Sequence, residues 1–213
     1  MLKKIIDLCY PNVCGFCGTI TKEVICPKCR LRLRECEQAT IQKELAKSYQ
    51  EYAYLFPYTG LIRQRMIQYK FYGATYLYRF WGQMICQEKS LKQWIQTYDC
   101  IIPVPIHPKR KRKRGFNQAE LVAKELESRL AIPVETNVLY KLIHNPPQSS
   151  LNKEKRKRNI LQVYRLRNQH LIQGKKVLLL DDIYTTGNTV EACSRVIQQA
   201  PVKKVGVLTI SKD

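Results

Sequence analysis

The chain has 213 residues and a formal net charge of +20, with 37 Lys and Arg residues against 17 Asp and Glu residues. Hydrophobic residues make up 45% of it, and no apolar run approaches the roughly 18 residues of a membrane span, so wholesale disorder and membrane insertion are both excluded. The excess of positive charge favours a polyanionic partner, which is nucleic acid, a phosphorylated metabolite or an acidic protein.

The N-terminal region is rich in cysteine, with six of the nine cysteines in the first 36 residues. We see no secretory signal pattern and expect a cytoplasmic protein whose thiols stay reduced. Two Cys-x-x-Cys pairs are separated by eight residues, a spacing that lets four thiolates converge on one tetrahedral ion. The four are Cys14, Cys17, Cys26 and Cys29. We predict a structural Zn²⁺ site in a module of residues 1–36, with iron or a redox dithiol as alternatives and with Cys9 and Cys36 as substitute ligands.

Residues 37–97 are predicted to form an aromatic-rich helical region. Twelve of the twenty aromatic residues lie between positions 49 and 81. Ile62, Met66 and Tyr69 recur at helical spacing, Gly73 would end that helix, and a second helix is expected over 76–94. The aromatic side chains are interpreted as helix core, the alternative being a surface on which nucleic-acid bases stack.

From Asp99 onward, strands alternate with helices, which is typical of an α/β domain with a mainly parallel sheet. Strands are predicted over 100–106, 134–142, 177–180 and 205–210, with a weaker one over 162–166. Asn117 is expected to cap a helix with an apolar stripe to Leu130, and another helix is expected over 190–199. We assign residues 98–213 to this domain.

Half of the net charge lies in two short basic segments, residues 109–114 and 153–158. Dense like charge repels itself, so we expect both segments to be exposed loops or helix ends.

The segment from Val177 to Thr189 is the strongest candidate for a binding site. A buried strand ends in Asp181 and Asp182, and a turn rich in hydroxyl groups, with Gly187 in it, leads into a helix. Free N–H groups at a helix start bind phosphate, and carboxylates at a strand end accept hydrogen bonds from sugar hydroxyls. The alternative is a capped helix after a core strand. Walker-type nucleotide binding is disfavoured because its glycine-rich motif does not occur.

This segment resembles the signature of type I phosphoribosyltransferases, which bind 5-phosphoribosyl-1-pyrophosphate (PRPP). The resemblance implies that Asp181 and Asp182 hold the ribose hydroxyls and that Mg²⁺ bridges ribose and pyrophosphate oxygens. It also implies that the turn wraps the 5-phosphate through Thr185, Thr186, Gly187, Asn188 and Thr189.

Three further stretches resemble the ComF family of late-competence proteins. They are Pro103–Pro108 with Arg114–Gln118, Gln148-x-x-Leu151 with Arg156-x-x-Asn159, and Tyr58-x-Gly60 through Lys70. In the phosphoribosyltransferase fold, one loop contacts pyrophosphate and a second closes over PRPP. This implies pyrophosphate or DNA contacts for Lys109, Arg110, Arg112, Arg114, Gly115, Asn117, Gln148 and Arg156.

The resemblance thus implies a type I phosphoribosyltransferase-like parallel sheet flanked by helices, with a small N-terminal zinc module and a helical hood-like region. It implies a cytoplasmic protein of DNA uptake in natural transformation that binds PRPP with Mg²⁺ and single-stranded DNA, beside a helicase partner. One alternative is an active phosphoribosyltransferase or a PRPP hydrolase, whose acceptor the sequence does not reveal. Another is a protein for which PRPP is a regulatory ligand without turnover.

Overall fold

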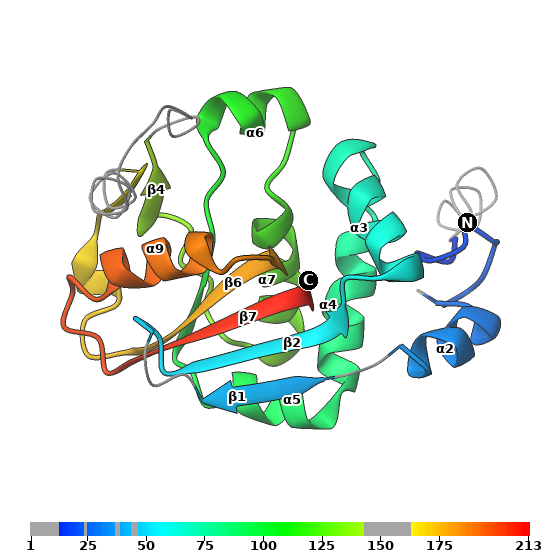
Figure 1. Cartoon of the computed structure of the whole chain (residues 1–213), viewed down its shortest axis with the longest axis horizontal. Coiled ribbons are helices and arrows are strands. Elements are labelled where there is room, and N and C mark those ends of the chain that lie inside the picture. The colour runs from blue at the N-terminus through cyan, green and yellow to red at the C-terminus, as the bar shows by residue number, and fades with distance from the viewer. Residues whose placement is uncertain (1–12, 24, 37–38, 44–46, 143–162) are drawn as a thin grey trace, which may run out of the picture.

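The computed structural model describes residues 13–23, 25–36, 39–43, 47–142 and 163–213. Its centre is a five-stranded sheet in the order β1-β2-β7-β6-β3, in which β1 is antiparallel to β2 and the other pairings are parallel (Figure 1). The strands are β1 (Thr40–Lys43), β2 (Glu51–Pro57), β3 (Cys100–Pro103), β6 (Lys176–Tyr184) and β7 (Lys204–Lys212).

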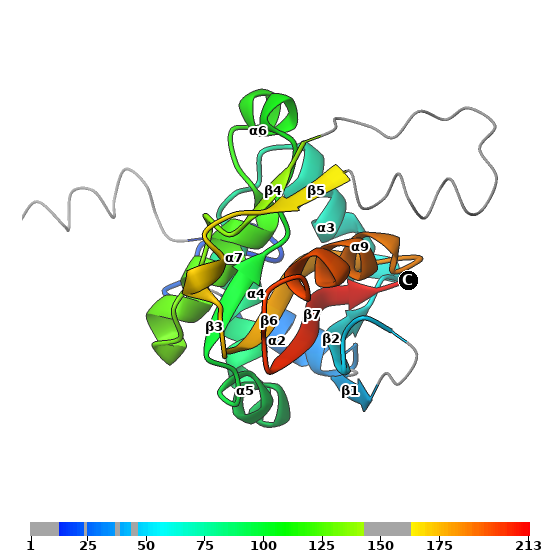
Figure 2. The ribbon, with the colours of Figure 1, turned by 90° about the vertical axis from the view of Figure 1, so that its left-hand side faces the viewer.

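Helices cover both faces of this sheet, as Figure 2 shows when the molecule is turned by 90°. One face is covered by α3 (Gly60–Phe71), α4 (Leu77–Gln87), α5 (Lys89–Ile95) and α7 (Gln118–Leu130), and the other by α9 (Asn188–Ile197). The N-terminal module contributes α2 (Pro27–Arg34), and α6 (Pro108–Arg114) follows β3. The expected α/β fold with a mainly parallel sheet is confirmed.

The side chains of β6 alternate between two hydrophobic cores. Leu178 and Leu180 face the core that contains α4 and α7, whereas Val177 and Leu179 face the core that contains α9. Successive residues of a strand point to opposite faces of the sheet. Because helices cover both faces, the inner strand β6 is apolar and buried at every position from Val177 to Leu180, before it reaches Asp181.

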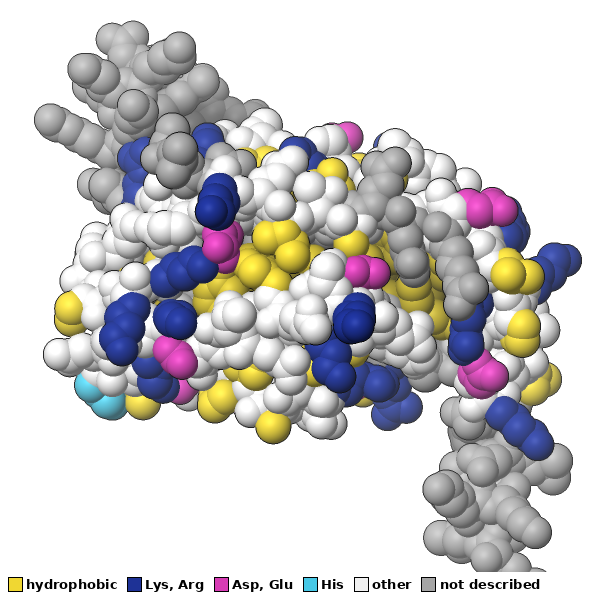
Figure 3. Space-filling model, turned by 90° about the horizontal axis from the view of Figure 1, so that it is seen from below, with side chains coloured by type: hydrophobic (Ala, Val, Ile, Leu, Met, Phe, Trp, Pro, Cys, Tyr) yellow, Lys and Arg dark blue, Asp and Glu magenta, His cyan; other side chains and the backbone are white. Residues whose placement is uncertain are grey.

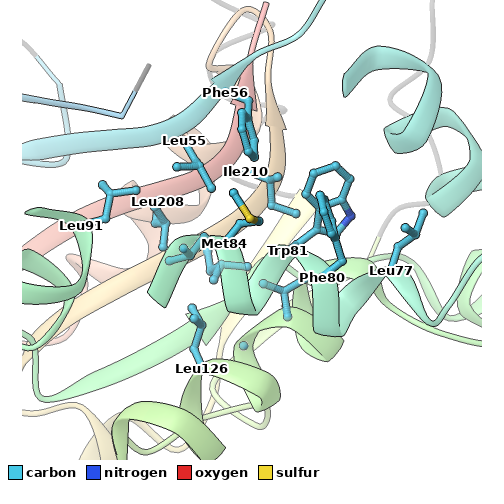
Figure 4. Packing of buried hydrophobic residues seen from close by; sticks show 14 of the residues in the cluster. Leu55, Phe56, Leu77, Phe80, Trp81, Met84, Leu91, Leu126, Leu208 and Ile210 are labelled. Atoms are coloured by element: carbon cyan, nitrogen blue, oxygen red, sulfur yellow. The ribbon is translucent and has the colours of Figure 1, made fainter. Parts of the chain in front are cut away.

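The larger core is built on α4, whose Phe80, Trp81 and Met84 pack against β2 and β7 (Figure 4). The ring of Trp81 lies 6.1 Å from that of Phe56, centroid to centroid. The N-terminal module joins the same core, because the ring of Phe16 lies 5.7 Å from that of Phe80.

A small antiparallel sheet lies beside the central one and consists of β4 (Leu139–Lys141) and β5 (Tyr164–Leu166), followed by the 3-10 helix η1 (Gln169–Leu171). Residues 143–162 lie outside the described part of the chain. The predictions for Gln148, Arg156 and the second basic segment therefore fall outside it as well. Among the helices that are described, none combines the length and the apolar character needed to cross a membrane.

The structure corrects three expectations about individual elements. Residues 37–97 are not wholly helical, because β1 and β2 lie there and β2 pairs in parallel with β7. The helix expected over 76–94 is two helices, since Glu88 leaves the helical conformation and its carboxylate accepts a hydrogen bond from the Ser90 N–H at the start of α5. The strand expected over 134–142 is reduced to β4, which pairs with β5 and not with the central sheet.

The first basic segment is a helix, α6, and not a loop. Its N-terminus has Pro108 at the first helical position, and His107 Nδ1 accepts a hydrogen bond from the Lys109 N–H at 3.1 Å. Its end is fixed by Gly115, which has a φ of 85° that favours glycine. Lys109 to Lys113 are exposed, so solvent screens the repulsion within the helix.

Candidate functional site

A cavity of about 500 Å³ lies at the carboxyl ends of β3 and β6. It is bounded by the C-terminal end of α3 and by α6, which stand on either side of the strand ends in Figure 1. Asp181, Asp182, Thr185 and Thr189 all line it. The structure therefore brings four of the residues predicted for the phosphate and ribose site into one cavity, in the crevice where open α/β sheets bind ligands.

The acidic pair belongs to β6 itself, which continues to Tyr184. Asp182 is buried, with 8% of its surface exposed, and its backbone N–H donates a hydrogen bond of 2.8 Å to Asp181 Oδ1. Burial, and after it the Asp182 carboxylate, raise the pKa of Asp181 to about 7. Two carboxylates held side by side in this way resist being ionised together. They therefore favour a positively charged partner that compensates their negative charge.

Lys70 supplies part of this compensating positive charge. Its Nζ lies 2.9 Å from Asp182 Oδ1, and both side chains are largely buried. Lys70 lies near the end of α3, where the preceding residue, Tyr69, donates a hydrogen bond of 2.8 Å to the Gln118 carbonyl of α7. A side chain from the aromatic-rich region is thus part of the candidate site.

Four further cations line the cavity: Arg110, Lys113 and Arg114 from α6, and Lys141 from β4. Burial lowers the pKa of both Arg114 and Lys141, and the nearby Arg110 lowers both further. Within the described residues, no carboxylate forms an ion pair with any of these four. The cavity therefore carries positive charge that an anion would neutralise.

Lys and Arg side chains are not confined to the cavity. On the face of the molecule seen from below, they are interspersed with Asp and Glu side chains and with hydrophobic ones (Figure 3). The cavity differs because four cations from α6 and β4 meet there with only the two carboxylates of Asp181 and Asp182 among its lining residues, and none of the four forms an ion pair within the described residues. This difference, and not the net charge alone, marks it as an anion site.

The turn between β6 and α9 is shaped by Gly187, whose φ is 74°. A Cβ at this position would lie 2.3 Å from the Tyr184 hydroxyl, so a larger residue would have to displace that ring. Tyr184 is held in turn by the Tyr49 hydroxyl at 3.1 Å and by the Tyr52 ring at 4.4 Å. Among the described residues no side chain caps α9, so its first N–H groups are offered to a ligand.

Asn117 connects the loop after β3 to α7. Its Nδ2 donates a hydrogen bond of 3.0 Å to the Val104 carbonyl, and its Oδ1 accepts one of 3.2 Å from the Ala119 N–H. The expected helix cap at Asn117 is therefore confirmed. The same residue lines the cavity, so it also fixes the cavity wall.

The remaining predicted residues are placed differently. Arg110 and Arg114 line the cavity, whereas Lys109, Gly115, Thr186, Gly187 and Asn188 do not. Arg112 lines a second cavity of about 690 Å³ on the other side of α6. Lys70, Phe71 and Lys141 also line the first cavity, although none of them was predicted as a site residue. A usable signal existed for Phe71, an apolar residue that does not continue the stripe of Ile62, Met66 and Tyr69.

The four predicted metal-binding cysteines converge in the N-terminal module. The Sγ atoms of Cys14, Cys17, Cys26 and Cys29 all lie within 4.8 Å of one another. The Sγ atoms of Cys17 and Cys26 are 3.8 Å apart. This matches the edge of about 3.8 Å in a tetrahedron with metal–sulfur bonds of about 2.3 Å.

The backbone and a neighbouring hydroxyl support these thiols. The Cys26 N–H donates a hydrogen bond of 3.3 Å to Cys14 Sγ. Hydrogen bonds with Thr19 lower the pKa of Cys17 to about 6, whereas burial raises the pKa of Cys29. The four side chains therefore fit a tetrahedral metal ion. Cys36 lies outside the cluster, and Cys9 lies outside the described residues.

Comparison with known proteins bears on the family. A family model for the phosphoribosyl transferase domain matches residues 112–212. The chain is 28% identical over 160 residues to competence protein F of Haemophilus influenzae, which covers 75% of this chain and 69% of that protein. It is 24% identical over 195 residues to competence protein ComFC of Bacillus subtilis, with 87% and 78% covered. These similarities support a relationship to the ComF family.

A further relative is the DNA utilization protein YhgH of Salmonella typhimurium, which is 25% identical over 201 residues that cover 90% of this chain and 86% of that protein. Among solved structures, glutamine PRPP amidotransferase from B. subtilis aligns with a TM-score of 0.44 at 18% identity. That alignment covers 62% of this chain and 25% of that one, so this chain spans about a quarter of the enzyme's length.

We predict that Asp181 makes the protein less stable as pH rises. The Asp181 pKa is raised to about 7 in the folded state and is about 3.9 in an unfolded chain. The folded state therefore keeps a proton that the unfolded state has lost, and stability falls between about pH 4 and pH 7. Asp181→Asn should raise the free energy of unfolding by about 1–2 kcal/mol at pH 8 and by much less at pH 4, measured by urea denaturation.

Asp213→Asn, which makes the same charge change at an exposed position, is the control and should show no such difference between the two pH values. An equal effect of Asp181→Asn at pH 4 and pH 8 would contradict the prediction.

Proposed function

We propose that this protein binds PRPP with Mg²⁺ in the cavity between α3 and α6 and binds single-stranded DNA beside it. We further propose that it acts in the cytoplasm on DNA taken up during natural transformation, next to a helicase partner. The names of its relatives, which are competence and DNA utilization proteins, support the setting. The observation that carries the proposal is the meeting of an acidic pair, a hydroxyl-rich turn and unpaired cations in one cavity.

Each part of PRPP has a chemically matched partner among the residues that line this cavity or follow it. The carboxylates of Asp181 and Asp182 would accept hydrogen bonds from the ribose hydroxyls. The turn from Thr185 to Thr189 and the free N–H groups at the start of α9 would hold the 5-phosphate. The cations of α6 would hold the pyrophosphate. Mg²⁺ bound with PRPP would neutralise part of the pyrophosphate charge and polarise its oxygens.

Lys70 would contribute by pairing with Asp182, because the ammonium group at 2.9 Å compensates the charge of the carboxylate in a largely buried position. A carboxylate offers oxygens that accept hydrogen bonds from the two hydroxyls of a diol. The ion pair therefore prepares the acidic pair for ribose.

Folding of the first basic segment as a helix separates its charges onto different faces. Arg110, Lys113 and Arg114 are spaced as i, i+3 and i+4, and all three line the PRPP cavity. Lys109 and Arg112 are also three residues apart, are exposed and do not line it. We assign the first set to pyrophosphate and the second to the phosphates of a DNA strand.

The cysteine module is proposed to hold Zn²⁺ as a structural ion. All four ligand positions would be filled by thiolates, which leaves no open position for catalysis. Phe16, located between two of these cysteines, packs on Phe80 of α4. The metal would thus help to hold the module against α4 in the larger core.

We predict that the protein binds PRPP in the presence of MgCl₂ and that the double variant Asp181→Asn/Asp182→Asn binds at least about tenfold more weakly, because two ribose contacts are lost. Isothermal titration calorimetry measures the affinity. Asp213→Asn is the control and should bind as the wild type does. An absence of PRPP binding to the wild type, or equal binding to the double variant, would contradict the proposed PRPP site. Phosphorus NMR of the same mixtures reports PRPP breakdown and so separates binding from hydrolysis.

We predict single-stranded DNA binding whose log–log salt slope is about −0.7 per phosphate neutralised. Lys109→Ser/Arg112→Ser should reduce the slope by about 1.4 and leave PRPP affinity unchanged. Arg110→Ser/Arg114→Ser, an equal charge change on the other face of α6, should weaken PRPP binding instead. Fluorescence anisotropy at four salt concentrations measures the slope. An unchanged slope in the first double variant would remove Lys109 and Arg112 from the DNA footprint.

We predict about one zinc ion per chain by elemental analysis, and a melting temperature about 4–8 °C lower after chelation, because an ion that ties four side chains to the core is lost. Cys26→Ser should lose most of the zinc. Cys36→Ser, a substitution outside the cluster, should retain it. A zinc-free wild type that melts at the same temperature with and without chelator would refute a structural zinc site.

A further inference from the structure

Three aromatic side chains at the end of α3 and just beyond it are exposed to solvent. Phe71 is 66% exposed, Tyr72 76% and Tyr76 46%. In the part of the chain that the structure describes, every other aromatic side chain is buried or half-buried. Leaving three large rings in water within six residues forgoes hydrophobic stabilisation that burial would provide. Such a concentration therefore points to a partner with a complementary flat surface.

Phe71 has no part in the packing of α3. The buried stripe of that helix consists of Ile62, Met66 and Tyr69, and Phe71 does not continue it. Its ring instead lines the PRPP cavity and lies 5.3 Å from the guanidinium carbon of Arg114. A cation stacked on one side of the ring leaves the other side free for a planar group.

The position of Phe71 is fixed relative to the acidic pair. The preceding residue, Lys70, forms the ion pair of 2.9 Å with Asp182, and Tyr69 is hydrogen-bonded to the Gln118 carbonyl. The last turn of α3 is thus attached both to β6 and to α7. A ring held in this way binds a planar group with little loss of conformational freedom.

We propose that Phe71 is a nucleobase-stacking residue at the mouth of the cavity and that Tyr72 and Tyr76 extend the stacking surface away from it. This surface rests on the proposed function, because it serves the strand whose phosphates lie along α6. Aromatic rings beside a row of cations are the combination that binds single strands without sequence preference.

The arrangement favours a strand over a free nucleobase. A free base in the cavity would need only one aromatic side chain to stack on, whereas here the exposed aromatic residues continue from Phe71 to Tyr76. Exposed cations likewise continue beyond the cavity on α6, at Lys109 and Arg112. The stacking surface begins on α3 and the outward cations lie on α6, the two helices that bound the cavity, and together they suit a polymer.

The test compares two labelled oligonucleotides with the same number of phosphates, a dT 12-mer and an abasic 12-mer, by fluorescence anisotropy. Phe71→Ala should weaken binding of the dT 12-mer by about 5- to 150-fold, the range for one base stacked on an aromatic ring, and should leave the abasic 12-mer unaffected. Phe71→Trp should restore the preference for the dT 12-mer. Leu31→Ala, which also removes an exposed apolar side chain, is the control and should change neither affinity.

Equal effects of Phe71→Ala on the two oligonucleotides, or no effect on either, would overturn the stacking role while leaving salt-dependent DNA binding intact. Failure of the wild type to bind either oligonucleotide would overturn the proposed DNA function and this inference with it. In the Phe71→Trp variant, quenching of the added tryptophan emission by free adenine with PRPP, and none by the dT 12-mer, would overturn the assignment to a strand.

Discussion

The candidate site depends on how two adjacent carboxylates are kept in a largely buried cavity. Asp181 and Asp182 end the apolar part of β6, where neither carboxylate has full access to water. Burying a charge is costly unless a partner compensates it, and two neighbouring negative charges increase the cost. Lys70 provides compensation for Asp182, and Asp181 responds with a raised pKa. A bound ligand that brings hydroxyl groups and a cation would donate hydrogen bonds to the two carboxylates and compensate their remaining negative charge.

Because Lys70 comes from α3, the acidic pair depends on elements far from it in the sequence. Helix α3 is held through Ile62 and Met66 in the same core as α4. The cysteine module contacts both helices, since Phe16 packs on Phe80 and the Arg65 guanidinium lies 5.5 Å from the Phe16 ring. The module is therefore connected to the cavity through two helices, which gives a structural metal a physical route to affect ligand binding.

Features encoded locally could be predicted from the sequence, and features that depend on distant partners could not. The apolar run of β6, the Asn117 cap and the spacing of the four cysteines each reside in a few neighbouring residues. Strand β2 was missed because its alternation is carried by aromatic residues, which were assigned to helix core, and because its partner β7 lies near the other end of the chain. Lys70 was missed as a site residue for the same reason, since Asp182 is remote in sequence.

The helical fold of the basic segment changes what its charge can do. An extended loop would present all six cations to one surrounding polyanion, and PRPP and DNA would compete for them. In α6 the 3.6-residue period turns Arg110, Lys113 and Arg114 toward the cavity at the ends of β3 and β6, while Lys111 is paired with Glu120 and Arg112 lines the second cavity. Two anionic ligands can then occupy opposite faces of one short helix. Their remaining coupling is electrostatic and unfavourable, because the two anions repel each other and each lowers the positive potential that attracts the other.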